Sequence, residues 1–499
     1  MIITPLGHTE FLVDISNSSL ENTRILIDSW LSDFVIGDLM QRSVGVTLDI
    51  TQLSTIDAIY ISHSHMDHLD PYTLTLIYKH ANPLLILPIT LKYLEGVLNE
   101  FLPNAQLHFL SPKTPFHFKG IEITGYMFSQ NDITNEDDVM MITLSNDREL
   151  LFAEIDTVID EYDEEVQAEL FHIFDRREYE TRTYIASRNE LEGQLRIYDF
   201  DEKRRKSFRA QYISEKKEEM KSRYEKFEYE EYVDFPNIYT LPGFNRGFVG
   251  QGLKYPTFLS KSLSEISIFP LDEIVSMETD IARSFGYEFS QKALLLGRQY
   301  KIENGIIETG RKECPIGSFG GSEKNIGESM NRIFANQPLI PREVIMSHLQ
   351  DDCSRILTIL NTRFIPYWSA SPVASLRSAL LKNPDGTYRI ELKIKNSDSI
   401  IFEYSFSSTE FVRVPYISKT RVDEEYWIED ILDFLDGKQE LYSNFWHTMD
   451  PKKIYRLWTC LGANFCNNDI IIKKYRLHFE KAISGKTSND WVVPILTSM

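Results

Sequence analysis

A histidine-rich turn between a strand and a helix constrains this chain more than any other segment. Residues 61–70 read Ile-Ser-His-Ser-His-Met-Asp-His-Leu-Asp, which places His63, His65, Asp67 and His68 within six residues. The apolar, β-branched run before the turn is typical of a buried strand, and the Asp-Pro pair after it is typical of a helix start. In α/β folds, the carboxyl end of a strand is where ligand-binding atoms are exposed.

The residue types in this turn predict a metal site. Imidazole and carboxylate groups are ligands of zinc, iron and manganese, and ligands close together in the sequence lose less entropy when they chelate an ion. A polar turn that is histidine-rich for no chemical reason is the alternative, and it does not account for four ligand-type side chains at one strand end. We therefore expect these side chains to bind one or two divalent ions, with zinc favoured and manganese or iron as alternatives.

The spacing His-x-His-x-Asp-His resembles the signature of the metallo-β-lactamase superfamily. Residues 7–13 and 24–31 resemble the first two strands of that fold. The Gly-His opening and the Asp-Ser-Trp-Leu turn resemble one branch of the superfamily. That branch includes ascorbate-6-phosphate lactonases, N-acyl-phosphatidylethanolamine phospholipases and the hydroxylase domain that acts on CMP-N-acetylneuraminate. The resemblance extends over roughly the first 160 residues and weakens beyond them.

The resemblance implies an α/β fold, the four-layer αββα metallo-β-lactamase sandwich, and a role for each site residue. His63 and His65 would hold a first metal, Asp67 and His68 a second, and Asp67 would also guide a proton. Asp156 follows a predicted hairpin of residues 139–144 and 149–155, where the family places an aspartate that bridges both metals. The remaining implied residues are Asp28, at a strand end facing the metals and the substrate, and His348, as a further ligand.

The chain departs from the family pattern just before the hairpin. The family supplies a histidine in the region of Met127, and this chain has none there, although Asp132 lies nearby. A thioether is a poor ligand for a hard cation that carries hydroxide. One metal position is then short of a ligand, mononuclear, or completed from elsewhere, with His8, His172 and His348 as candidates.

Two interpretations of the segment around His348 stay open. Residues 344–349 read as a strand that ends in this histidine, which suits a last metal ligand. Residues 341–361 also read as an amphipathic helix. In the helical case the last strand of the family would fall at residues 363–368, which carry an aromatic side chain where the ligand belongs, and the metal site would be degenerate.

The chain is long enough for several folded units. The stretch from residue 160 is densely charged, with aromatic residues mostly three or four apart, and this pattern predicts amphipathic helices. Mixed charges there indicate a solvated face, or alternatively a lid or a partner surface. The expected organisation is two halves of the metallo-β-lactamase fold at residues 1–159 and 236–372, a charged helical insertion at 160–235, and a C-terminal α+β accessory domain at 373–499.

The second half of the predicted fold contains glycine-rich loops. In the first of these, residues 243–252, Arg246 is a candidate for binding a phosphate or carboxylate of the substrate. The segment matches neither a Rossmann nor a P-loop pattern, and an ordinary long loop is the alternative. If Arg246 has this role, the substrate is a small anionic molecule.

Charge and composition exclude several classes of function. Lys and Arg number 53 against 74 Asp and Glu, and a net charge of −21 disfavours nucleic acid and anionic membranes as partners. The charge also counts against the nucleases of the superfamily, which carry a basic groove. The chain has no apolar run of membrane-spanning length and no secretory signal at its start, so we expect a cytoplasmic protein. Its 4 cysteines do not make a disulfide framework.

These observations favour a metal-dependent hydrolase that acts on an ester, lactone or phosphodiester of a small molecule through metal-bound hydroxide. A diiron oxygenase on the same fold is the second hypothesis, although the chain lacks the Rieske pattern of Cys-x-His paired with Cys-x-x-His. A degenerate member that acts through binding is the third. The helical insertion and the C-terminal domain are candidate surfaces for a protein partner or a homo-oligomer.

Overall fold

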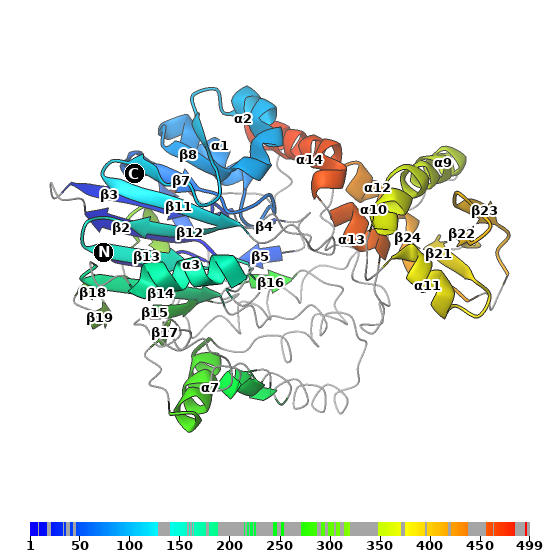
Figure 1. Ribbon diagram of the computed structural model, residues 1–499. Coiled ribbons are helices and arrows are strands. Elements are labelled where there is room, and N and C mark those ends of the chain that lie inside the picture. The colour runs from blue at the N-terminus through cyan, green and yellow to red at the C-terminus, as the bar shows by residue number, and fades with distance from the viewer. Residues whose placement is uncertain are drawn as a thin grey trace.

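The computed structural model describes most of the chain, and two large mixed sheets dominate it (Figure 1). The described residues are 1–7, 9–16, 21–32, 34–35, 40–42, 46–127, 140–156, 159, 162, 164–175, 179–187, 214, 217–218, 220–222, 224–225, 243–246, 251–253, 271–286, 291–294, 298–303, 306–309, 314–319, 348–370, 375–394, 397–417, 421–437, 456–462, 464–484 and 495–496.

The first sheet has eight strands, and their pairing changes from antiparallel to parallel at β3. The strands on one side, up to β3, pair antiparallel, and those from β3 to β9 pair parallel. The histidine-rich turn follows β7, which is the neighbour of β3 on the parallel side. In order across the sheet the strands are β19 (Ile306–Thr309), β18 (Tyr300–Glu303), β1 (Ile2–Pro5), β2 (Phe11–Ser16), β3 (Asn22–Ile27), β7 (Ala58–Tyr60), β8 (Leu84–Pro88) and β9 (Gln106–Leu110).

The second sheet has seven strands and the same mixed plan. Strands β10 to β13 pair antiparallel, and β13 to β17 pair parallel. The predicted hairpin is confirmed as β12 and β13, so the chain leaves β13 towards Asp156. In order, the strands are β10 (Phe116–Phe118), β11 (Ile121–Met127), β12 (Met140–Ser145), β13 (Glu149–Ala153), β14 (Thr181–Ser187), β15 (Gly243–Arg246) and β17 (Gln291–Ala293).

The alternation of buried residues along the strands explains how the layers stack. In β3, Ile25 and Ile27 pack into a core shared with the second sheet, whereas Leu26 packs into a core with helices α1 (Pro71–His80), α2 (Glu95–Phe101) and α14 (Asn464–Ser484). On the far side of the second sheet, α3 (Glu164–Asp175) packs on β13 and β14. The predicted α/β class is confirmed, and the order is helices, sheet, sheet, helix.

The sequence predicted a helical insertion from residue 160, but the segment is only partly helical. It begins with α3, but residues 181–187 form β14, which pairs parallel to β13 and β15 inside the second sheet. The sequence there is Thr-Arg-Thr-Tyr-Ile-Ala-Ser, whose β-branched and aromatic residues suit a strand. The charges around β14 suggested helices. The strand forms because its own side chains are buried on both faces of the sheet.

A second unit near the C-terminus has its own core, in which helices cover a four-stranded sheet. In this sheet β21 and β22 form an antiparallel hairpin. The sheet order is β23 (Val412–Val414), β22 (Ile400–Ser405), β21 (Thr387–Lys393) and β24 (Glu424–Trp427). The helices are α9 (Leu349–Ile359), a π-helical turn (Leu360–Phe364), α10 (Ile365–Ala370), α11 (Leu376–Lys382), α12 (Ile428–Leu435) and α13 (Arg456–Gly462).

The second unit corrects one local prediction. Residues 363–368, the alternative last strand, are helical and bury Phe364 and Trp368. Helix α12 begins at Ile428, directly after residues 424–427, which pair with β21 as β24. The core of this unit also includes side chains from α9 and α10, which precede the predicted boundary at residues 372/373.

Two small sheets, two 3-10 helices, helix α7 and several short helical pieces complete the described elements. No described helix combines the length and the apolar character that crossing a bilayer requires. The remaining elements are the sheet of β4 (Phe34–Val35), β5 (Met40–Arg42) and β16 (Gln251–Leu253), the sheet of β6 (Val46–Asp49), β20 (Gly317–Phe319) and β25 (Ile495–Leu496), the 3-10 helices Leu53–Thr55 and Ile89–Leu94, helix α7 (Leu271–Ser284) and short helical pieces between residues 214 and 225.

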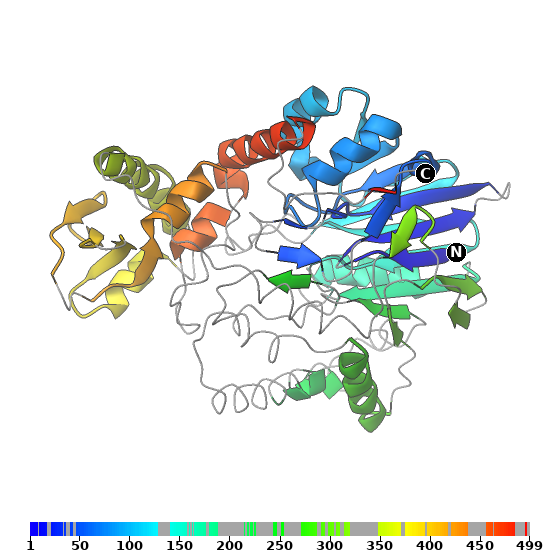
Figure 2. The same ribbon diagram turned by 180° about the vertical axis from the view of Figure 1, so that it is seen from behind.

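Helix α14 joins the two units. In both views it lies beside α1 and α2 of the first unit and runs to the second (Figures 1 and 2). Its side chains belong to both cores: Ile470 packs in the second unit, and Tyr475 and Phe479 pack against the helices of the first. Among the described elements, the last long helix therefore returns to the layer that covers the histidine-rich turn.

Candidate metal centre

The histidine-rich turn lies where the sequence predicts it, between β7 and α1. Asp70 caps α1 by accepting a hydrogen bond from the amide of Tyr72 at 2.9 Å, and Pro71 is the first helical residue. Inside the turn, the amides of His68 and Leu69 both donate to the carbonyl of His65, at 3.0 and 2.8 Å. These bonds fold the turn back on itself and bring its side chains to one side.

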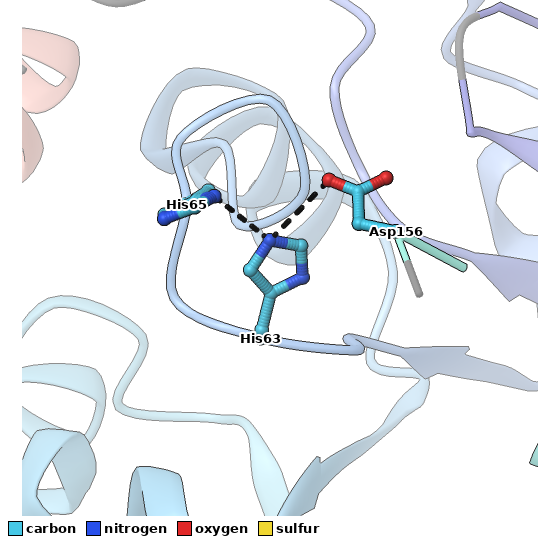
Figure 3. Close-up of side chains that lie close together, drawn as sticks. All are labelled: His63, His65 and Asp156. Carbon is cyan, nitrogen blue, oxygen red and sulfur yellow. Dashed lines mark hydrogen bonds and ion pairs between the residues drawn. The ribbon is translucent and has the colours of Figure 1, made fainter. Parts of the chain in front are cut away.

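Three of the predicted ligands form one cluster. His63 Nε2 lies 2.9 Å from His65 Nδ1 and 3.7 Å from Asp156 Oδ2 (Figure 3). One donor atom from each of the three side chains lies within 4.8 Å of the others. Two atoms bound to one tetrahedral zinc ion, each about 2.0–2.1 Å from it, are about 3.4 Å apart. The spacing and the donor types therefore fit a divalent transition-metal ion.

His68 and Asp67 extend the cluster on the other side of Asp156. His68 Nε2 lies 2.9 Å from Asp156 Oδ2 and 3.9 Å from Asp67 Oδ2. The His63 and His68 rings are close, with centroids 3.9 Å apart. A single oxygen of Asp156 thus faces both His63 and His68, which is the position that a bridging carboxylate requires.

Asp28 holds the far side of the His68 ring. Its Oδ2 lies 2.7 Å from His68 Nδ1, and its Oδ1 accepts from the amide of Ser62 at 2.9 Å. Asp28 follows β3 in the left-handed region, with φ 54°, a conformation that aspartate tolerates better than most residues. The side chain is fully buried, which leaves it no surface for a substrate. Its geometry is that of a residue that orients a metal ligand.

Two hydroxyl groups complete the surroundings of the imidazoles. Thr9 Oγ1 lies 3.2 Å from His68 Nδ1, and Ser62 Oγ lies 2.9 Å from His63 Nδ1. Neither residue was predicted from the sequence. Ser62 directly precedes His63, so its place in the turn was a usable signal. Thr9 lies between β1 and β2, far from the turn in the sequence, and gave none.

The exposed side of the cluster is narrow. His63 and His68 are fully buried, and Asp67 is 6% exposed. His65 and Asp156 are half-buried, and both belong to the three-residue group. A molecule from solvent would therefore meet the cluster at His65 and Asp156.

Burial and neighbouring charges raise the pKa values of both Asp67 and His68. The rise favours the neutral form of Asp67 and the charged form of His68. Burial raises the pKa of Asp67, and Asp156 adds to the rise, although His68 and His65 oppose it. Burial disfavours a charge on His68, but the carboxylates of Asp156, Asp28 and Asp67 outweigh it and raise the pKa of His68 well above the ordinary 6.5. A proton on His68 thus compensates the carboxylates in the metal-free protein, and a divalent ion would supply the same compensation.

The structure does not bring the other described candidate ligands, His348 and His172, into the cluster of His63, His65 and Asp156. His348 is exposed and occupies the N-cap of α9, in the second unit. His172 is exposed on α3. Met127 ends β11, and its side chain packs against the core between the two sheets. His8 and Asp132 lie outside the described residues.

Arg246 is placed by its backbone alone. It is the last residue of β15 and pairs with Ser187 of β14, which runs parallel to β13. The three strands end at the same edge of the second sheet, the edge from which Asp156 emerges. With neighbouring strands about 4.8 Å apart, the Arg246 backbone lies about 10 Å from the end of β13.

No protein-family model matches the chain, and no curated protein matches it. Similar solved structures include CmlA, a diiron β-hydroxylase from Streptomyces venezuelae, at 15% identity and a TM-score of 0.27 over 38% of this chain and 35% of that one. A possible metal-dependent hydrolase from Veillonella parvula matches at 16% identity and a TM-score of 0.30, over 40% of this chain and 75% of that one. The metallo-beta-lactamase fold protein YhfI from Bacillus subtilis matches at 12% identity and a TM-score of 0.24, over 38% of this chain and 71% of that one.

The match spans only about a third of the CmlA chain, 35% or 36% in two structures. All these TM-scores are low.

Proposed function

We propose that the protein is a metal-dependent hydrolase of the metallo-β-lactamase superfamily. The observation that carries the proposal is the convergence of His63, His65 and Asp156 from two different sheets on one point. The strand pairing, antiparallel on one side of each sheet and parallel on the other, supports it, because both chain segments leave the carboxyl ends of strands with parallel neighbours, β7 and β13. Nitrogen and oxygen donors at this spacing favour zinc, with manganese or iron as alternatives.

The residues around the cluster have separate roles in this proposal. A bound ion would supply a water molecule ionised near neutral pH. Asp28 holds Nδ1 of His68, so that Nε2 of the same ring faces Asp156. Asp67, buried beside His68, is the group that can hold a proton close to the reacting atoms. His65 and Asp156, the half-buried members, face the incoming substrate.

The substrate class that we propose is an ester, lactone or phosphodiester of a small molecule. Attack on such a centre develops negative charge on an oxygen atom, which a cationic centre stabilises. Arg246, at the same sheet edge as Asp156, is proposed to bind an anionic group of the substrate. The net charge of −21 makes nucleic acid an unfavourable substrate.

The proposal is tested by measuring the metal content and the hydrolytic activity of a variant that lacks one proposed ligand. His65→Ala removes a ligand and is expected to abolish metal loading and hydrolysis of chromogenic ester, lactone and phosphodiester substrates, as measured by elemental analysis and absorbance. His117→Ala is the matched control, because His117 is 72% exposed on β10, and it is expected to keep both properties.

Full metal content in purified His65→Ala would remove the assignment. Iron with a visible absorption band and no hydrolysis would favour the oxygenase hypothesis instead. A wild-type protein that stays metal-free after incubation with zinc, manganese and iron would leave a protein that acts through binding.

A further inference from the structure

A tyrosine from the end of the chain contacts the metal-binding turn. The hydroxyl of Tyr475, on α14, donates a hydrogen bond to the backbone carbonyl of Ser64. Ser64 is the residue between His63 and His65, and both Ser64 and Tyr475 are 1% exposed. We propose that Tyr475 is a positioning residue of the metal centre, a proposal that rests on the proposed function and adds a residue to its machinery.

The Ser64 carbonyl controls how the two histidines face each other. It belongs to the peptide plane that joins Ser64 to His65, so its direction sets the backbone angles on either side of that plane. The distance between His63 Nε2 and His65 Nδ1, 2.9 Å, depends on those angles, because the two side chains lie on either side of Ser64. A buried hydroxyl that holds this carbonyl therefore holds the spacing of two ligand atoms.

Helix α14 is held firmly enough for Tyr475 to act as a fixed point. One residue further on, Arg476 Nη1 contacts both carboxylate oxygens of Glu100 on α2, at 2.6 and 2.7 Å. Phe479 stacks on Phe101 with ring centroids 5.5 Å apart. These contacts lie on the same two turns of α14 as Tyr475.

The same helix is anchored in the second unit. Asp469 pairs with Arg363 at 2.8 Å, and Lys473 pairs with Asp436 at 3.2 Å. Ile470 packs in the core of that unit. Tyr475 thus links the metal-binding turn to a helix whose position depends on the second unit.

Tyr475→Phe tests the proposal, because it removes one oxygen atom and keeps the ring that packs in the core. The expected result is a Co²⁺ affinity about tenfold weaker than that of the wild type, as expected for a partner that supports metal ligands. The visible spectrum of the Co²⁺ protein should change in band position or intensity, because the geometry of the ligands changes. Both are measured by titration with Co²⁺ in competition with a chelator.

Tyr78→Phe is the matched control. Tyr78, on α1, is buried in the same core, and its hydroxyl donates to the carbonyl of Pro83 at 3.0 Å. The two variants therefore lose the same kind of hydrogen bond, and their metal-free forms are expected to melt within a few degrees of each other. Only the Tyr475 variant should change Co²⁺ affinity and spectrum.

Equal Co²⁺ affinity and an unchanged spectrum in wild type and Tyr475→Phe would overturn the proposal while the proposed function stands. Absence of Co²⁺ binding in the wild type would instead overturn both. If Tyr475→Phe does not fold, Arg476→Ala carries the test, since it releases the same turn of α14 from Glu100 at the surface. A weaker Co²⁺ affinity in Arg476→Ala supports the proposal, and an unchanged affinity overturns it.

Discussion

At the scale of single residues, Asp28 shows how one buried carboxylate determines the chemistry of its neighbour. It lies 2.7 Å from Nδ1 of His68, and a carboxylate can only accept a hydrogen bond. It therefore favours the form of His68 that carries a proton on Nδ1 and leaves Nε2 to face Asp156. The positive φ of Asp28 places the carboxylate between Ser62 and His68.

Asp28→Asn is expected to weaken metal binding by about 10- to 100-fold. Asparagine has nearly the same shape and tolerates a positive φ, but its amide can present N–H groups to His68 and favour the wrong tautomer. Zinc affinity, measured by competition with a chelating dye, checks this. Asp14→Asn is the control, because Asp14 is a buried carboxylate that pairs with Arg24 on β2 and β3. An equal loss of affinity in both variants would contradict the role of Asp28.

At the scale of elements, the close approach of α14 to the residues just after α12 depends on a glycine. Gly437 follows α12 with φ +70°, and a Cβ atom there would lie 2.6 Å from Cα and 2.8 Å from N of Lys474. Both distances involve backbone of α14, which cannot move as a side chain can. The absence of a side chain at Gly437 thus allows the backbone of α14 to lie close to the end of α12.

Gly437→Ala is expected to lower the free energy of unfolding by at least about 2 kcal/mol, since left-handed strain and a backbone clash add together. Gly286→Ala separates the two causes: Gly286 has φ +83°, and nothing lies within 4 Å of its added Cβ. Strain alone should cost Gly286→Ala about 1 kcal/mol. Urea denaturation of both variants measures the difference, and equal losses would show that the clash is relieved without cost.

At the scale of the whole molecule, metal binding and pH are expected to act on stability together. The raised pKa of His68 means that its stabilising contribution is complete below 6.5 in the metal-free protein and is lost as the pH rises through the raised value. The raised pKa of Asp67 acts in the same direction. A divalent ion must displace the proton from His68, so its binding strengthens as the pH rises.

The difference in melting temperature between zinc-loaded and chelator-treated protein should therefore increase from about pH 6 to about pH 8. At a free zinc concentration 1,000 times Kd, the ion adds about 4 kcal/mol to the stability of the folded state. Differential scanning fluorimetry in both conditions checks this, and His68→Gln should show a smaller dependence on pH. A difference that stays constant or shrinks as the pH rises would contradict the linkage.

Local sequence patterns predicted a large part of the fold and of the candidate site. The strand, the turn and the Asp70-capped helix around His63 are confirmed, as is the hairpin that delivers Asp156. Strand β14 was missed, because mixed charges near it resemble a solvated helix, while burial on two faces is visible only once its neighbours are known. The helical alternative for the segment after His348 agrees with α9, and the predictions for Arg246 and for the domain boundaries stay predictions.

The sequence by itself determined that donors for a metal ion lie in one turn between a strand and a helix, since hydrophobic periodicity and capping act over a few residues. Only the tertiary structure decided which donors meet. Asp28 lies beside His68, Asp156 beside His63, and Tyr475 beside Ser64 through contacts between residues far apart in the chain. Such contacts depend on how sheets and helices pack, and no local pattern encodes them.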